Sequence, residues 1–224
     1  MFVIMFLFLF VAYVKIEDKT NSIFSHSPIK PTITSSGSLG LWRYDQGKCV
    51  ATYPNQTLIG EETFDWCSNI ASKNDDNPWI TYSFPNKAMR LTGYAIRNGC
   101  CYYFRCCNPE TNTDIDGYCC CRLYSYSLQG SVDNHTWKTI HKVEKDKEYW
   151  YCLLKYFDFP ETEPFKYIRL IMDEEYPGCQ KCLQINQLEL YGRLIDSFDT
   201  FGDYDINDVE SDESVSIIGK IKRE

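Results

Sequence analysis

The sequence predicts an all-β fold, a sandwich of seven or eight short antiparallel strands. Seventeen tyrosines, thirteen phenylalanines and five tryptophans accompany only twelve glycines and four methionines, which favours strands packed face to face over a helical bundle. The apolar residues recur with a period of two, and turn-forming residues separate the alternating segments. At 224 residues, the chain matches a single domain with tails.

The N-terminus carries an unbroken apolar run from Phe2 to Val14. This run is shorter than the roughly 20 residues that span a bilayer as a helix, and it matches the apolar region of a secretory signal. We therefore interpret residues 1–14 as a signal peptide or a short anchor, and we expect no transmembrane span. A buried strand or an uncleaved interfacial anchor is the alternative.

Two further segments differ in composition from the rest of the chain. Residues 15–40 are rich in Ser, Thr, Pro and Gly without an apolar period, which predicts a linker. Residues 193–224 are acidic, which predicts a flexible, solvated tail. The compact domain is expected over residues 41–192.

Within this domain the alternating segments predict the strands one by one. Trp79 to Phe84 alternates between Pro78 and Pro85, and the next segment stops at the turn pair Asn98-Gly99. A turn over Val132-Asp133-Asn134-His135 predicts a hairpin between its flanking strands. The predicted strands are 79–84, 90–96, 123–131, 136–140, 151–159, 165–171 and 183–190.

The order of these segments resembles the coagulation-factor 5/8 type C family, the discoidin domains, over residues 60 to 192. The matching segments are Asp65-Trp66-Cys67-Ser68, Pro78-Trp79-Ile80-Thr81-Tyr82, Leu91-Thr92-Gly93-Tyr94-Ala95-Ile96, Tyr124 to Ser131 with Trp137, Phe165 to Leu170, and Ile185 to Gly192. The resemblance implies an eight-stranded jelly roll of the galactose-binding-like type. It also implies binding of carbohydrate, phospholipid or protein through loops at one end.

The chain departs from the family in its cysteines. Many members join the first and last strands by a disulfide, but no cysteine follows Gly192 here, so Cys49 and Cys67 need other partners. Seven of the twelve cysteines lie between Gly99 and Arg122, inside an insertion between two matched strands. The twelve disulfide candidates, of unknown pairing, are Cys49, Cys67, Cys100, Cys101, Cys106, Cys107, Cys119, Cys120, Cys121, Cys152, Cys179 and Cys182.

Two interpretations of the cysteines remain open. In a secreted protein they form disulfides, and adjacent cysteines pair with different partners. In an intracellular protein they stay reduced or bind zinc, with Cys179-Gln180-Lys181-Cys182 as the one ligand knuckle. A strong zinc-binding pattern contains two copies of the C-x-x-C spacing, and this chain contains one. We therefore predict no metal site.

The insertion also carries the predicted ligand-binding residues, Tyr102, Tyr103, Phe104 and Arg105. Aromatic faces stack on sugars, and an arginine binds a carboxylate or phosphate through two hydrogen bonds. The alternative is that these aromatic side chains fold inward over the end of the sandwich.

Other chemistry is weakly indicated. Asn74 to Asn77 and Asp114 to Gly117 offer oxygen ligands for calcium, with turn formation as the simpler explanation, and no cofactor is predicted. The histidines His26, His135 and His141 lie in no nucleophile motif, so we predict no catalytic residue and no enzyme.

Two N-x-S/T triplets make Asn55 and Asn134 candidates for glycosylation. A formal charge of −8 argues against nucleic acid as a partner. We therefore predict a non-catalytic, secreted or surface-exposed recognition module that binds a glycan or another cell-surface protein or lipid ligand, with a role in adhesion. The alternative is an intracellular interaction or scaffold module of the same fold.

Overall fold

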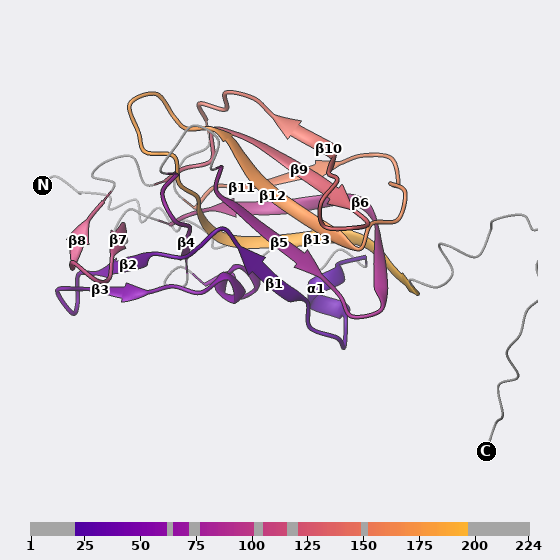
Figure 1. The fold of residues 1–224 in the computed structure, drawn as a ribbon, viewed down its shortest axis with the longest axis horizontal. Helices are drawn as coiled ribbons and strands as arrows, with labels where there is room; N and C mark the ends of the chain where they lie inside the picture. Colours follow the sequence, from indigo (N-terminus) through magenta and orange to yellow (C-terminus); the bar gives the residue numbers. More distant parts are fainter. Residues whose placement is uncertain are drawn as a thin grey trace, which may run out of the picture.

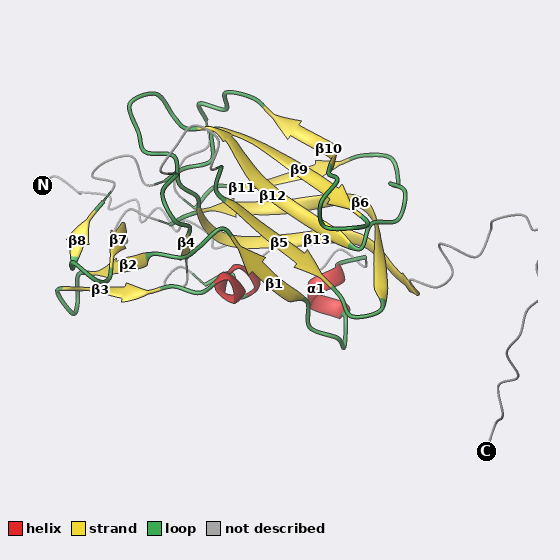
Figure 2. Ribbon diagram, viewed as in Figure 1, coloured by secondary structure: helices red, strands yellow, loops and turns green. Residues whose placement is uncertain are grey.

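The computed structural model describes residues 21–61, 65–71, 77–100, 105–115, 121–148 and 152–196. These residues form thirteen strands, one short α-helix and one 3-10 helix. Two sheets face each other as the layers of a sandwich, and a third, smaller sheet extends one end (Figures 1 and 2). The all-β sandwich that the sequence predicts is therefore confirmed.

The first layer is a five-stranded antiparallel sheet in the order β1-β5-β12-β9-β10. Its strands are β1 (Thr32–Ser35), β5 (Trp79–Ser83), β12 (Tyr167–Glu174), β9 (Ser125–Ser131) and β10 (Lys138–Val143). Burial alternates along β12 from Tyr167 to Asp173, because successive side chains point to opposite faces of a strand. The predicted hairpin is confirmed, since β9 pairs with β10 across the turn at residues 132–137.

The second layer is a four-stranded antiparallel sheet in the order β11-β6-β13-β4. Its strands are β11 (Leu154–Asp158), β6 (Lys87–Asn98), β13 (Gln184–Asp196) and β4 (Trp66–Cys67). β6 and β13 are long and pair along most of their length, so they form the centre of this layer. β13 continues to Asp196, beyond the predicted domain boundary at residue 192.

The main hydrophobic core lies between the two layers. Tyr82 and Tyr126 enter it from the five-stranded sheet, and Tyr94 and Trp66 enter it from the four-stranded sheet, all fully buried. Burying one large apolar side chain stabilises the fold by about 1.5–3 kcal/mol. None of the described cysteines belongs to this core.

The third sheet has the order β3-β2-β7-β8 and holds part of the cysteine insertion. Its strands are β3 (Lys48–Ala51), β2 (Gly40–Arg43), β7 (Cys106–Asn108) and β8 (Thr113–Asp114). A second, small core underlies it, formed by Leu41 with the sulfur atoms of four cysteines, Cys67, Cys106, Cys121 and Cys182. The β7 part of the insertion is therefore anchored to the segment between β1 and β5, through pairing with β2 and disulfides to Cys49 and Cys67.

The structure corrects the predicted linker over residues 15–40. Within its described part, α1 (Ile23–His26) and β1 belong to the domain. Ile23 and Phe24 are buried in the main core, and the Glu189 carboxylate accepts hydrogen bonds from the Phe24 amide at 2.8 Å and from the Ser25 hydroxyl at 2.7 Å. Two adjacent apolar residues in a polar segment carry no periodic signal, which is why the pattern failed here.

The predicted signal peptide at residues 1–14 and most of the acidic tail at 193–224 lie outside the described residues. Among the residues that are described, no helix is both long and apolar enough to cross a membrane.

Candidate functional site

The connections between strands gather at two ends of the sandwich, because all neighbouring strands are antiparallel. One end, which we call the cysteine-rich end, carries the connections 36–78, 99–124, 144–153 and 175–183. The opposite end carries the turns 84–86, 132–137 and 159–166, together with the two limits of the described chain (Figure 1). Binding groups tend to lie on loops that a rigid scaffold holds, so both ends are candidate sites.

Four disulfides whose cysteines are both described tie the cysteine-rich end together. They join Cys49 to Cys107, Cys67 to Cys106, Cys100 to Cys152, and Cys121 to Cys182. The adjacent residues Cys106 and Cys107 bond to different partners, as predicted for neighbours that point to opposite sides of a strand. Cys179 is also disulfide-bonded. Cys101, Cys119 and Cys120 lie outside the described residues.

These bonds bear on the zinc interpretation. Both cysteines of the predicted knuckle, Cys179 and Cys182, are disulfide-bonded, and a disulfide sulfur is not the thiolate that zinc requires. In the described part of the chain, no group of three or more His, Cys, Asp or Glu side chains is arranged to hold a metal ion.

Gly40 allows the third sheet to close against a disulfide. A Cβ at this position would overlap the Sγ atom of Cys49 and lie 2.9 Å from the Val50 carbonyl oxygen. On the other edge of β2, the Trp42 amide donates to the Arg105 carbonyl at 2.7 Å. Strand β2 is thus held on one edge by close packing against β3 and on the other edge by the hydrogen bond to Arg105.

Of the predicted binding residues, only Arg105 lies in the described part of the chain; Tyr102, Tyr103 and Phe104 lie outside it. Arg105 is half-buried, and its Nη1 atom lies 3.3 Å from Oδ2 of Asp114. Asp114 was also a calcium candidate, and its carboxylate faces this guanidinium. Of the other calcium candidates, Asn74 to Asp76 and Asp116 lie outside the described residues.

Two aromatic groups at the cysteine-rich end were not predicted as site residues. The Arg122 guanidinium lies 3.5 Å above the ring of Tyr176, and Tyr124 meets the same ring edge-on at 5.3 Å. Trp42 packs against Tyr44, which is 54% exposed. No sequence signal links Arg122 to Tyr176, because they meet only through the fold.

A buried polar network underlies this end. The Asp65 carboxylate accepts hydrogen bonds from the Cys100 amide at 2.6 Å, from Nε2 of Gln184 at 2.7 Å and from Nδ2 of Asn186 at 2.7 Å. Burial raises the pKa of Asp65 to about 7 against the opposing effect of these hydrogen bonds. The network joins the first disulfide of the insertion to the core strand β13.

The three histidines lie apart from one another. His26 is in α1, with Nδ1 at 3.1 Å from the Ser22 carbonyl oxygen, and His135 is exposed in the β9–β10 turn. His141 packs in an aromatic group with Phe157, and its Nδ1 lies 2.9 Å from the Tyr94 hydroxyl. Desolvation lowers the pKa of His141. Packing therefore accounts for His141 and a local hydrogen bond for His26, and His135 is a surface residue of the turn.

Both glycosylation candidates are exposed. Asn55 lies in η1 (Pro54–Leu58), where the hydroxyl of Thr57 is buried and lies 2.8 Å from the Tyr82 hydroxyl. Asn134 lies in the β9–β10 turn with a φ of 63°, a conformation that Asn tolerates better than most residues.

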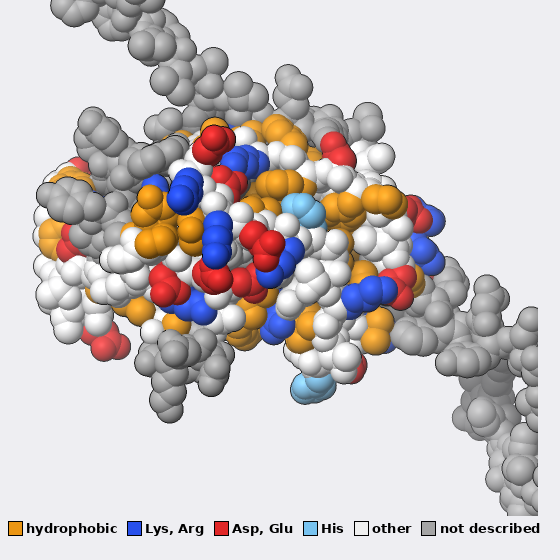
Figure 3. Space-filling model, turned by 90° about the horizontal axis from the view of Figure 1, so that it is seen from above, with side chains coloured by type: hydrophobic (Ala, Val, Ile, Leu, Met, Phe, Trp, Pro, Cys, Tyr) orange, Lys and Arg blue, Asp and Glu red, His pale blue; other side chains and the backbone are white. Residues whose placement is uncertain are grey.

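The described surface contains several hollows. One of about 720 Å³ lies between β1 and η1, one of about 440 Å³ lies beside the 159–166 turn, and one of about 260 Å³ lies beside the 84–86 turn. Charged side chains of both signs alternate on the face seen from above (Figure 3). Among the described residues, Lys142 is paired with Glu144 and Lys138 with Glu163.

Comparisons with known proteins show the fold. No family model matches the chain, and no curated protein matches it. Among solved structures, the chain is similar to CBM32-1 and CBM32-2 with the M60 catalytic domain of Clostridium perfringens ZmpB. That match has a TM-score of 0.51 and 11% identity, and it covers 77% of this chain and 15% of the other.

Two further solved structures match at a lower level. CpGH89CBM32-5 of Clostridium perfringens, in complex with GalNAc-β-1,3-galactose, gives a TM-score of 0.44 at 14% identity over 73% of this chain and 95% of the other. A Streptococcus pneumoniae fucose-binding module gives a TM-score of 0.44 at 12% identity. That match covers 72% of this chain and 91% of the other. The chain therefore has the galactose-binding-like fold, which carbohydrate-binding modules of family 32 share with discoidin domains.

Proposed function

We propose that this protein is a non-catalytic carbohydrate-recognition module whose binding site is the cysteine-rich end. The observation that carries the proposal is a set of disulfide-fixed loops that present aromatic rings beside guanidinium groups. Trp42 packs against Tyr44, and Arg122 lies over the ring of Tyr176. Rigid aromatic and arginine side chains are the usual energetic centres of binding surfaces.

The fold supports this function without naming the ligand. The module shares its fold with carbohydrate-binding modules, but one fold hosts many functions, so the argument rests on the site. Tyr102, Tyr103, Phe104 and Arg105 remain proposed contact residues, since they belong to the same insertion. A cell-surface protein or lipid ligand would use the same aromatic and basic groups and is an outcome of the experiment below.

A glycan array with the full, oxidised chain tests the proposal. We expect saturable binding to a defined glycan class. Tyr44→Ala and Tyr176→Ala should each weaken that binding by about tenfold, since each removes one stacking platform. Tyr156→Ala is the matched control, because Tyr156 is 41% exposed on β11 of the sandwich. Binding to no glycan, or equal loss in the control, would refute a glycan site at this end.

We also propose that the protein is secreted or exposed at the cell surface, with no resident cofactor. Stable disulfides belong to oxidising compartments, and the exposed Asn55 and Asn134 of the two sequons and the apolar run at residues 1–14 fit that route. Intact mass of the natively expressed protein, before and after reduction and deglycosylation, should show disulfides, added glycan and loss of the leader. Free thiols or a bound zinc mass would instead support the intracellular alternative.

A further inference from the structure

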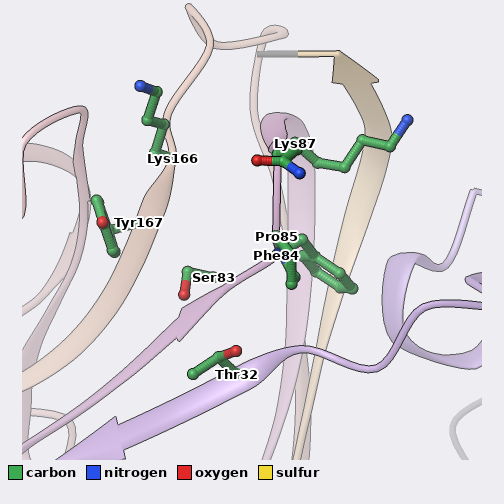
Figure 4. Close-up of a pocket in the computed structure, with 8 residues that line it drawn as sticks. Thr32, Ser83, Phe84, Pro85, Lys87, Lys166 and Tyr167 are labelled. Atoms are coloured by element: carbon green, nitrogen blue, oxygen red, sulfur yellow. The ribbon is translucent and has the colours of Figure 1, made fainter.

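The hollow between β1 and η1 differs in its lining from the hollow beside the 84–86 turn. The hollow at the turn is lined in part by the hydroxyl side chains of Thr32, Ser83 and Tyr167 (Figure 4). Of the described residues that line the hollow between β1 and η1, only Lys30 and Asn55 are neither apolar nor aromatic. Its volume of about 720 Å³ lies within the roughly 300–1,000 Å³ of small-molecule sites. We call it the apolar hollow.

The lining of the apolar hollow has a supported part and an exposed part. Ile33 of β1 and Leu58 of η1 are half-buried and pack against the main core. Tyr53 and Ile59, which flank η1, are 63% and 44% exposed. Contiguous exposed apolar surface usually marks a place where something binds. The apolar hollow therefore has a rigid wall and a rim that is open to an occupant.

Asn55 places a modification site inside the apolar hollow. It is the acceptor of the triplet Asn55-Gln56-Thr57, its side chain is exposed, and it lines the hollow. A sugar on its side-chain nitrogen would therefore begin within the hollow and would exclude other occupants from it.

The burial of Thr57 fixes the direction in which Asn55 points. The Thr57 side chain is fully buried. Its hydroxyl donates to the Pro54 carbonyl at 2.7 Å and lies 2.8 Å from the Tyr82 hydroxyl. A 3-10 helix has three residues per turn, so side chains two residues apart point in different directions. With Thr57 anchored in the core, Asn55 is held on the outer side of η1, where it meets the hollow.

We propose that a glycan attached to Asn55 occupies the apolar hollow, with the C–H face of its first N-acetylglucosamine packed against Tyr53 and Ile59. A sugar ring stacks on an aromatic face through its C–H groups while its hydroxyls stay in water, which suits an apolar lining. The covalent link makes this contact intramolecular, so a weak stacking interaction is sufficient.

This inference rests on the secretory route proposed above, because N-linked sugars are added to proteins that follow that route. The folded chain buries Thr57, the third residue of the triplet, so attachment at Asn55 precedes the folding of η1. The helix then closes with the sugar already in place.

Hydrogen exchange in η1 tests the inference on the full chain, expressed in a eukaryotic secretory host. Peptide mass spectrometry locates the sugars, and an endoglycosidase trims each glycan to its first N-acetylglucosamine. The amides of residues 56–59 should exchange about fivefold more slowly in this protein than in Asn55→Gln, as expected for one stacking contact. Asn134→Gln is the control and should leave η1 unchanged, since Asn134 lines none of the three hollows.

A double-mutant cycle separates the sugar contact from the loss of Tyr53 itself. In a Tyr53→Ala background, the difference between the glycosylated protein and Asn55→Gln should disappear. In a Tyr156→Ala background it should persist, because Tyr156 lies on β11 and does not line the apolar hollow. Enzymatic removal of the whole glycan from the folded wild type, which converts Asn55 to aspartate, gives the same comparison without a variant that has to fold.

The outcomes distinguish this inference from the secretory route on which it rests. Sugar on neither Asn55 nor Asn134 would refute both. Sugar on Asn134 alone, or sugar on Asn55 without slower exchange, would overturn the packing and leave the secretory route standing. Slower exchange that depends on protein concentration would assign the apolar hollow to a second copy of the chain and would also overturn the inference.

Discussion

At the scale of single residues, Asp65 is the most consequential side chain at the cysteine-rich end. It is fully buried, it accepts three hydrogen bonds, and its pKa is raised to about 7 from an ordinary 3.8. Desolvation is the main cause, because the charged carboxylate loses its water on burial. The protonated acid is therefore the form that the folded protein favours.

The sign of this shift predicts how stability depends on pH. A carboxyl whose pKa is raised in the folded state contributes its full share of stability below pH 4, where it is protonated in both the folded and the unfolded protein. This share of the stability is lost as the pH rises toward 7. The free energy of unfolding should therefore fall by about 1 kcal/mol per pH unit between these values through Asp65. Urea unfolding at several pH values measures it.

Asp65→Asn is the variant that isolates this contribution. The introduced amide oxygen can keep the bonds from Cys100 and Gln184, while the charge is removed. We expect the variant to lack this part of the pH dependence. A variant whose stability falls as steeply as that of the wild type between pH 4 and 7 would assign the effect to other groups.

At the scale of elements, the two cores divide the molecule into a sandwich and a disulfide-dependent extension. As far as the chain is described, the main core contains no cysteine, whereas the small core under the third sheet consists of Leu41 and four disulfide cysteines. Each disulfide over loops of this length contributes on the order of 2–4 kcal/mol. The extension should therefore depend on oxidation much more than the sandwich does.

Hydrogen exchange under reducing conditions tests this division. After reduction and alkylation, the amides of β2, β3, β7 and β8 should lose protection, while those of β5, β9 and β12 keep it. Simultaneous loss of protection in all strands would show instead that the disulfides support the whole fold. Oxidised protein carried through the same steps is the control.

Helix α1 lies in the segment that the sequence pattern predicted to be a linker, and it gives a third prediction. Phe24 is 5% exposed and packs against Tyr82, with ring centroids 4.9 Å apart. Phe24→Ala should lower the free energy of unfolding by about 3 kcal/mol, because it leaves a cavity in the main core. Ile29→Ala, at a site 38% exposed, is the control. An effect of Phe24→Ala no larger than that of the control would support the linker interpretation.

At the scale of the whole molecule, local pattern predicted most of the sandwich but little of the site. Segments such as Trp79 to Phe84 alternate clearly because one face is buried, so the pattern found them. The short strand β1 alternates over only four residues between prolines and serines, and the pattern missed it. Disulfide partners and the contact of Arg122 with Tyr176 depend on the tertiary fold, so no local pattern contains them.

The two ends of the sandwich differ in chemistry. The cysteine-rich end offers aromatic rings and guanidinium groups on disulfide-linked loops, and the opposite end has a hollow lined by Thr32, Ser83 and Tyr167. A single rigid scaffold carries both, so ligands at the two ends can be distinguished by which amides respond to them.

Chemical-shift mapping of the strongest array binder on the oxidised, isotope-labelled chain tests the central claim most directly. The account predicts that the perturbed amides cluster in residues 40–44, 105–115, 121–124 and 176–182, and that Tyr44→Ala and Tyr176→Ala weaken the response. Perturbations confined to the turns 84–86, 132–137 and 159–166 would contradict a glycan site at the cysteine-rich end.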